Sequence, residues 1–282
     1  YVSGWLHAYP EIYESTETTN SGRIRRISAA KHFSAHRLEI YPAEWVEIGI
    51  MEAVVYGERG LEPSYLNPFN LYYSAEHNLG DMDNVAWGAD VEIRPAAGVS
   101  LYGELFIDDL KTGELGTDFI GNKFAYTGGI KWAEAGRMKN VDLNLEYSRL
   151  DPFVYSHFYD INVYKNWNSS LGYFLPPNSD RWYLGLEWRP VYSFSAGMSA
   201  EFIRHGENTN EINAGGDIGV PPESNQGTVK FLSGERNDVS VYQLSARWEP
   251  LEAYSISGKI RWRDFRGGGQ LEWQTTFGVN VW

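Results

Sequence analysis

Two side chains that could perform acid–base chemistry stand close together near the start of the chain. Ser34 and His36 point the same way if their segment is extended, as a nucleophile and its base would need. Nothing marks a third residue that would orient the histidine, and such pairs arise often by chance. No phosphate-binding glycine loop, metal-binding histidine pair or nucleophile elbow occurs either. The sequence therefore does not favour catalysis.

A second kind of chemistry is carbohydrate recognition, because sugars present an apolar face to aromatic rings and hydroxyl edges to amides. Two polar segments, near residues 65–73 and 164–168, mix aromatic side chains with asparagines in this way. The alternative is that these rings anchor loops that pack on themselves. The carbohydrate-binding candidates are Tyr65, Asn67, Asn70, Tyr72, Tyr73, Asn166, Trp167 and Asn168.

Metal binding is the third possibility. Glu76, Asp81 and Asp83 are close in sequence, and carboxylate oxygens are the ligands that Ca²⁺ takes. Their spacing lacks the ligand positions and glycine of an EF-hand loop, so a solvated acidic segment is the better interpretation. The chain has 0 Cys, which excludes thiolate sites and disulfides. We expect no metal and no cofactor.

The elements that position these residues are strands, because apolar and polar residues alternate with a period of two. In residues 254–263, Tyr254, Ile256, Ile260 and Trp262 fall on one face, and serines and cations on the other. Similar segments recur at residues 85–94, 99–108, 124–132, 141–147, 182–189, 194–202, 242–248 and 271–279. Most span about 9–11 residues, the length with which a tilted strand crosses a bilayer.

Composition agrees with strands that are apolar on one side only. Aromatic residues make up 15% of the chain while the mean hydropathy is −0.42, and no apolar run is long enough for a membrane helix. The aromatic content also excludes a disordered chain. Trp and Tyr stand at the ends of the apolar faces, which is typical of interfacial girdles; the alternative is the core of a large sandwich. The sequence predicts an all-β fold, an antiparallel transmembrane β-barrel forming one domain over residues 1–282.

Connections alternate between short and long. Short, mostly proline-containing turns occur near residues 42–44, 95–98, 134–140, 190–193 and 250–253, and longer loops near 57–84, 109–123, 151–180, 204–237 and 265–269. Barrels of this class place short turns in the periplasm and long loops outside the cell. We expect about twelve strands in a bacterial outer membrane. The long loops would then be extracellular, and the short turns and the C-terminus would be periplasmic.

Charged residues on the polar faces would line the interior. They form either opposing acidic and basic walls, as in charge-selective pores, or mutually neutralising pairs, which buried charges usually require. The formal net charge of −13 argues against a nucleic-acid partner. The expected lumen charges are Asp90, Glu92, Glu104, Asp108, Asp142, Glu146 and Glu187 on the middle strands, with Arg37, Arg247, Lys259, Arg261 and Arg263 elsewhere.

With this strand map, the chain resembles the Wzi capsule-assembly family. The resemblance rests on spacing and pattern at HRLEIYP (36–42), VEIGI (46–50), SLYGE (100–104), YSH (155–157) and YFLP (173–176), and on residues 90–93, 108–109, 128–130 and 141–147. It implies an eighteen-stranded barrel with a periplasmic helical bundle, acting as a surface lectin that retains capsular polysaccharide. Only the later strands of the family have counterparts here. We therefore expect either a smaller relative or the C-terminal part of a larger barrel, and we favour the second.

Three functions follow as hypotheses. The first is a non-catalytic barrel that binds or anchors surface polysaccharide through its outer loops, in contact with outer membrane lipid and lipopolysaccharide, by itself or within a larger envelope complex. The second is a charge-selective porin for small solutes. The third is an enzyme resembling outer membrane phospholipases, which are twelve-stranded barrels of similar size, with Ser34 and His36 as its reactive pair. Ion conductance separates the first two.

Overall fold

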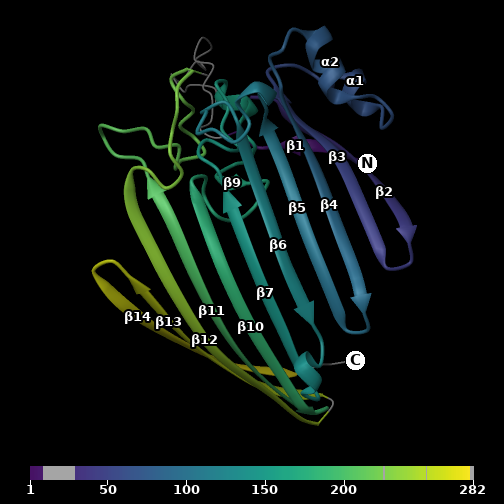
Figure 1. The fold of residues 1–282 in the computed structure, drawn as a ribbon, viewed down its shortest axis with the longest axis vertical. Coiled ribbons are helices and arrows are strands. Elements are labelled where there is room, and N and C mark those ends of the chain that lie inside the picture. The colour runs from purple at the N-terminus through teal and green to yellow at the C-terminus, as the bar shows by residue number, and fades with distance from the viewer. Residues whose placement is uncertain (9–28, 225, 252, 280–282) are drawn as a thin grey trace, which may run out of the picture.

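A computed structural model describes residues 1–8, 29–224, 226–251 and 253–279 (Figure 1). Its main feature in this part of the chain is a 12-stranded antiparallel sheet in which each strand pairs with the next along the chain. The strands are β1 (Val2–Leu6), β2 (Lys31–Ala43), β3 (Val46–Gly57), β4 (Asn84–Ala96), β5 (Val99–Asp109), β6 (Lys123–Trp132), β7 (Val141–Leu150), β10 (Ser179–Val191), β11 (Phe194–Glu207), β12 (Glu235–Leu251), β13 (Tyr254–Phe265) and β14 (Gly268–Val279). The predicted all-β architecture is confirmed.

The sheet curves into a deep trough, and its two edge strands, β1 and β14, do not pair with each other in the described chain (Figure 1). Short elements occupy the connections. They are α1 (Pro63–Leu66), α2 (Tyr72–Leu79), η1 (Thr112–Glu114), η2 (Ala135–Arg137), η3 (Asp160–Asn162), β8 (Lys165–Asn166) and β9 (Ser169–Ser170). Among the described residues, no helix combines the length and the apolar character needed to cross a membrane.

Strand register aligns the apolar faces into continuous rows. Met198, Leu244, Ile260 and Trp273 are successive neighbours across β11 to β14, and all four side chains are exposed on the convex side. The adjoining concave row holds Gly197, Ser245, Lys259 and Gln274. In these strands the apolar row thus faces outward and the inward row is small or polar, whereas a sandwich would have apolar inner faces.

Aromatic side chains form belts on the convex side. Toward the long-loop end, the rings of Tyr126, Tyr147 and Trp182 follow one another at centroid distances of 6.3 and 4.6 Å. Near the short turns, Trp188 and Phe194 lie 6.4 Å apart. Amphipathic rings at both ends of an apolar band match the two interfaces of a bilayer.

The prolines near the short turns lie inside the strands rather than after them. Pro42, Pro95, Pro190 and Pro250 each occupy a register shift in the last residues before a hairpin turn. Proline has no backbone N–H to donate, and a bulge is where a strand tolerates that loss. The expected turns are therefore present, but proline bends each strand end instead of terminating it.

Candidate functional site

The long loop between β7 and β10 (residues 151–178, the inner loop) folds into the trough. Its Val154, Tyr155, Tyr164 and Leu175 form a buried apolar cluster with inward-facing residues of the wall. Those wall residues are Ala53, Val55, Ala125 and Leu150, with Phe33, Ala35 and Phe106 packed beside them. The inner loop therefore fills the trough at the long-loop end (Figure 1).

A charged network holds the inner loop against the wall. The guanidinium of Arg181 donates to Glu146 Oε1 at 2.9 Å and to Glu201 Oε2 at 2.8 Å, although Arg181 is only 9% exposed. The Tyr173 hydroxyl of the inner loop donates to Glu146 at 3.1 Å and accepts from Ser148 at 3.0 Å. Of these residues, only Glu146 was predicted from the sequence. Arg181 and Glu201 could have been found because both occupy inward-facing positions of their strands.

Further polar contacts fix the course of the inner loop. Asp108 accepts the backbone N–H of Tyr155 at 2.8 Å, and Lys31 donates to the Val163 carbonyl at 2.7 Å. Burial raises the pKa of the Tyr155 hydroxyl to about 12 and lowers the pKa of His157 to about 4. Asp108, expected as a lumen charge, thus serves as a backbone anchor.

A fully buried asparagine joins two long loops. Asn178 donates from Nδ2 to the carbonyls of Gly206 (2.9 Å) and Ser233 (3.0 Å), and its Oδ1 accepts from the Leu232 N–H at 2.6 Å. Because the three bonds satisfy the buried amide, the inner loop and the loop between β11 and β12 are held together. No sequence pattern pointed to this residue.

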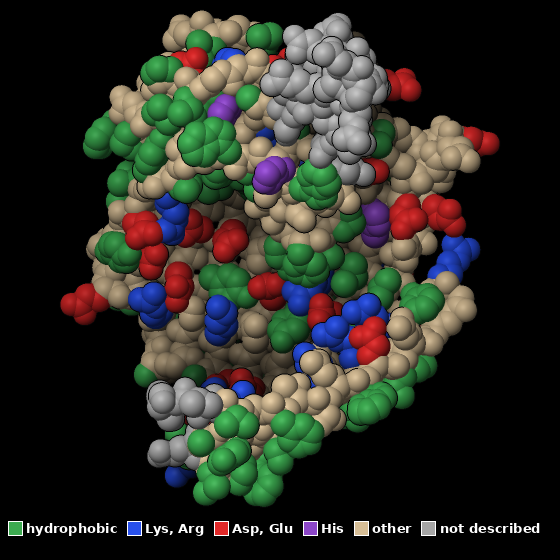
Figure 2. Space-filling view, turned by 180° about the vertical axis from the view of Figure 1, so that it is seen from behind, with side chains coloured by type: hydrophobic (Ala, Val, Ile, Leu, Met, Phe, Trp, Pro, Cys, Tyr) green, Lys and Arg blue, Asp and Glu red, His purple; other side chains and the backbone are tan. Residues whose placement is uncertain are grey.

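Most expected lumen charges pair with a neighbour on the same wall rather than across the trough. Figure 2, seen from behind, shows acidic and basic side chains gathered in the hollow. Among the described residues, Glu104, Asp108 and Lys259 have no ion pair, and Asp108 accepts the Tyr155 N–H instead. The others pair as Arg37 with Asp90, Arg94 with Glu92, Arg189 with Asp142 and Glu187, Arg181 with Glu146, Arg247 with Glu249, Arg263 with Glu272, and Arg261 with the amide of Gln243.

Below the inner loop, toward the short turns, the trough keeps an open cavity of about 1020 Å³. Small inward residues such as Gly197, Ser199 and Ser245 form much of its floor. Four cations, Arg94, Lys131, Arg247 and Lys259, and two carboxylates, Asp142 and Glu187, also line it. This lining suits water and polar solutes, but the inner loop stands between the cavity and the long-loop end.

One group of carbohydrate-binding candidates lies on a β-hairpin of the inner loop. Asn166 and Trp167 are held beside the end of β1, since the His7 N–H donates to Asn166 Oδ1 and the Trp167 N–H donates to the His7 carbonyl, both at 2.8 Å. The Trp167 side chain is 47% exposed, and Asn168 follows it in the turn between β8 and β9. A partly exposed indole between two amides is thus presented on a fixed backbone.

The other group lies on the outside of the trough, in the segment of α1 and α2 (residues 58–83, the outer hairpin). Tyr65 and Tyr72 are fully buried there against the convex face of β3, so their rings position the helices and are not accessible to a sugar. Asn67 and Asn70 bond within the segment, to the Phe69 N–H and the Ser64 carbonyl. Tyr73 is half-exposed and packs on Trp87 with ring centroids 4.9 Å apart.

The proposed reactive pair lies under this outer hairpin. Ser34 is fully buried and its hydroxyl donates to Ser3, while His36 Nε2 lies 3.2 Å from Glu52. No hydrogen bond joins Ser34 to His36 among the described residues. Glu52 also accepts the Tyr72 N–H at 2.9 Å and the Trp87 indole N–H at 3.0 Å. The carboxylate that meets His36 thus docks the hairpin and does not complete a catalytic arrangement.

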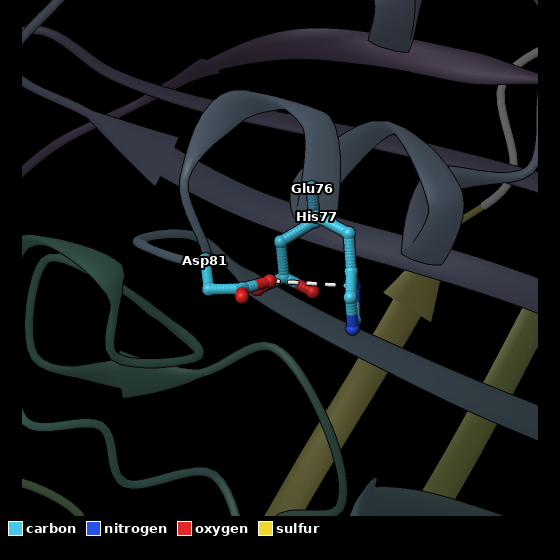
Figure 3. Close-up of side chains that lie close together, drawn as sticks. All are labelled: Glu76, His77 and Asp81. Carbon is cyan, nitrogen blue, oxygen red and sulfur yellow. Dashed lines mark ion pairs between the residues drawn. The ribbon is translucent and has the colours of Figure 1, made fainter.

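The acidic residues of the outer hairpin separate into two groups. Figure 3 shows Glu76, His77 and Asp81 at the end of α2, with ligand atoms within 4.8 Å of one another and His77 3.3 Å from Asp81. Asp83 instead accepts the Tyr65 hydroxyl at 2.7 Å and pairs with Arg59 at 2.5 Å. Burial, together with Asp83 and Asp81, raises the pKa of Glu76 to about 8. Asp83 is therefore a structural anchor and not part of a ligand set with Asp81.

Comparison with known proteins gives the class of fold. No protein-family model and no curated protein matches the chain. It is similar in structure to Wzi, an outer membrane protein involved in group 1 capsule assembly in Escherichia coli and a carbohydrate-binding β-barrel, at 15% identity and a TM-score of 0.55, over 89% of this chain and 51% of that one. This likeness shows the fold of an outer membrane β-barrel, and the chain spans about half the length of that structure.

Two other outer membrane barrels match less well. OccD1 (OprD) gives 11% identity and a TM-score of 0.44, over 93% of this chain and 61% of that one. OmpT of Vibrio cholerae with loop L8 deleted gives 8% identity and a TM-score of 0.39, over 98% and 72%.

Proposed function

We propose that this protein is a non-catalytic outer membrane barrel of the Wzi type that binds or anchors surface polysaccharide on its long-loop side. In this proposal the short turns face the periplasm, the long loops face the cell surface, and the convex face meets outer membrane lipid and lipopolysaccharide. The barrel would hold glycan at the cell surface, by itself or within a larger envelope assembly.

The observation that carries the proposal is the inner loop, which fills the trough and presents Trp167 between Asn166 and Asn168. An apolar cluster and the Arg181 network fix this loop, so the indole and its amides are preorganised for a ligand. Preorganisation matters because each sugar contact is weak, and a mobile loop would lose entropy on binding. The capsule role of Wzi is consistent with such a ligand.

A charge-selective porin is the second candidate, favoured by the polar cavity and its cations on the short-turn side. A porin needs that cavity to continue to the other end, and the inner loop occupies that end of the trough. The surface-binding role is therefore the better-supported proposal.

A glycan-array screen of the purified protein tests the proposal, with Trp167→Ala as the variant. We expect binding to acidic or neutral surface polysaccharides, reduced severalfold in the variant. Tyr192→Ala is the matched control, because Tyr192 is 93% exposed but lies in the short turn between β10 and β11. Absence of any glycan signal at millimolar concentration would refute the proposed function. Equal loss in both variants would refute the proposed role of Trp167 in glycan binding.

A further inference from the structure

The outer hairpin contains a long stretch without charge. Between Glu62 and Glu76 there is no Asp, Glu, Lys or Arg, although these residues make up 22% of the chain. The stretch holds Leu66, Phe69 and Leu71 in its exposed part. An uncharged, apolar surface segment is unusual for a loop that meets only water, and such patches mark contacts with another phase or partner.

The contacts of the hairpin place it on the convex wall, outside the trough. Tyr72, at the start of α2, donates its N–H to Glu52 and packs its ring 4.4 Å from His36, both outward residues of β3 and β2. The next outward positions along these strands toward the short turns are Ile50 and Leu38, both exposed. Two residues along a strand is a rise of about 7 Å. The segment that joins α1 to α2 (residues 67–71, the tip) therefore lies immediately beside the exposed apolar band.

The tip itself is apolar outside and hydrogen-bonded inside. Phe69 is 93% exposed and Leu71 is 64% exposed. The Phe69 N–H donates to Asn67 Oδ1 at 3.1 Å, the Asn70 N–H donates to the Asn67 carbonyl at 3.1 Å, and the Asn70 amide donates to Ser64 O at 2.8 Å. Backbone that enters lipid must satisfy its polar groups internally, and this tip does so for these groups.

The hairpin also covers polar groups that lipid would penalise. His36 and Glu52 are outward-facing, and Tyr72 of α2 covers both of them. Without this cover, a carboxylate and an imidazole would face the outer end of the apolar band, at a cost in free energy. The outer hairpin therefore replaces lipid above the band while its tip continues the apolar surface.

We propose that the tip inserts Phe69 and Leu71 into the lipid leaflet on the long-loop side, at the boundary between headgroups and acyl chains. Lipid is the occupant because the tip adjoins the band formed by Ile50 and Leu38 and carries no charge. The hairpin is thus a lateral membrane anchor on the convex wall, and this role is independent of glycan binding. It gives the segment around Asn67 and Asn70 a lipid partner in place of a sugar.

The chain has 0 Cys, so single-cysteine variants carrying a nitroxide label test the anchor in the lipid-reconstituted full chain. Phe69→Cys is the probe, Ile50→Cys is the lipid control and Glu223→Cys, on an exposed loop, is the water control. Paramagnetic relaxation by oxygen and by a water-soluble nickel chelate measures the environment of each label. We expect the oxygen-to-nickel ratio at position 69 to resemble that at position 50 and to exceed that at position 223 severalfold.

A ratio at position 69 equal to that at position 223 would overturn the anchor. Strong spin–spin broadening at position 69, with shielding from both reagents, would overturn it in favour of contact between two copies of the chain. Unchanged tryptophan fluorescence in all three variants confirms that the label has not disturbed the fold. If the labelled Phe69→Cys variant does not fold, Leu71→Cys serves as the second probe of the tip.

Discussion

The inner loop and the outer hairpin leave the same end of the sheet but pack on opposite faces of it. The inner loop carries Asp151, Asp160 and Lys165 and meets a wall rich in ion pairs. The outer hairpin carries six charged residues, but none lies between Glu62 and Glu76, where its tip lies beside the exposed Ile50 and Leu38. The two loops therefore differ in where their charges lie, and the part of the hairpin beside the apolar band has none.

The two loops also differ in how their tyrosines are satisfied. In the inner loop, Tyr173 joins a network with Glu146 and Ser148 on β7 and with Arg181 on β10. In the outer hairpin, Tyr65 bonds a single carboxylate, Asp83. The Tyr173 hydroxyl thus bonds charged groups of the wall, whereas Tyr65 bonds a carboxylate of its own segment and packs its ring on Tyr56 of β3 and Tyr72 of α2.

The largest effect is expected from Arg181→Met, which removes the cation from the network and leaves Glu146 and Glu201 without it. Removing one partner from a buried ion pair costs roughly 3–5 kcal/mol. The measurement is the urea midpoint of tryptophan fluorescence in lipid-reconstituted protein. Arg247→Met is the matched control, since its pair with Glu249 is exposed and such pairs contribute about 0–1 kcal/mol. Equal shifts of the urea midpoint in both variants would show that the Arg181 network contributes no more to stability than an exposed ion pair.

A smaller effect is expected when single tyrosine hydroxyls are deleted, one in each loop. Tyr173→Phe removes bonds to Glu146 and Ser148, and Tyr65→Phe removes one bond to Asp83. Hydrogen bonds to charged groups contribute about 1.5–3 kcal/mol. We expect faster amide exchange in residues 151–178 for the first variant and in residues 58–83 for the second. Acceleration of both loops by either variant would contradict their independence.

The most local effect concerns pH and the outer hairpin. The folded-state pKa of Glu76, about 8, lies above its ordinary value of 4.5, because of burial and the nearby Asp83, Asp81 and Asp109. Between these values the packed hairpin holds a proton that the unpacked hairpin has released. Packing is therefore most stable below pH 4.5 and weakens as pH rises through the window to 8.

Amide exchange in residues 72–79, corrected for its intrinsic pH dependence, measures this weakening. We expect greater local opening at pH 8.5 than at pH 5.5 in the natural sequence and little change in Glu76→Gln, whose side chain stays neutral. A pH response that persists in the variant would show that Glu76 is not its source.

The period-two pattern predicted the sheet because the two faces of each strand meet different surroundings, an apolar one outside and a polar one inside. The alternation in residues 254–263, for example, became β13 with Ile260 outward and Lys259 inward. Pairing of the lumen charges also followed from a general argument, since Arg37 and Asp90 or Arg189 and Asp142 are inward neighbours once register is known. The alternation could not predict which carboxylate each cation pairs with, because that depends on the register between strands.

The loops were less predictable because no periodicity governs them. Tyr65 and Trp167 both lie close to asparagines in the sequence, yet the Tyr65 ring is buried between α1 and β3 and the Trp167 ring is half-exposed on a hairpin. Ser34 and His36 share a face as expected, but the hairpin that covers that face comes from residues more than twenty positions later. Burial by a distant segment is a tertiary effect that local residue types do not encode.

Planar-bilayer conductance tests most directly whether the inner loop closes the trough. The comparison is between the intact protein and a variant in which residues 157–172 are replaced by a short glycine–serine linker. We predict no steady current through the intact protein and stepwise channels in the variant, since the cavity of about 1020 Å³ would then open at the long-loop end. Steady channels in the intact protein, or a variant as silent as the intact protein, would contradict it.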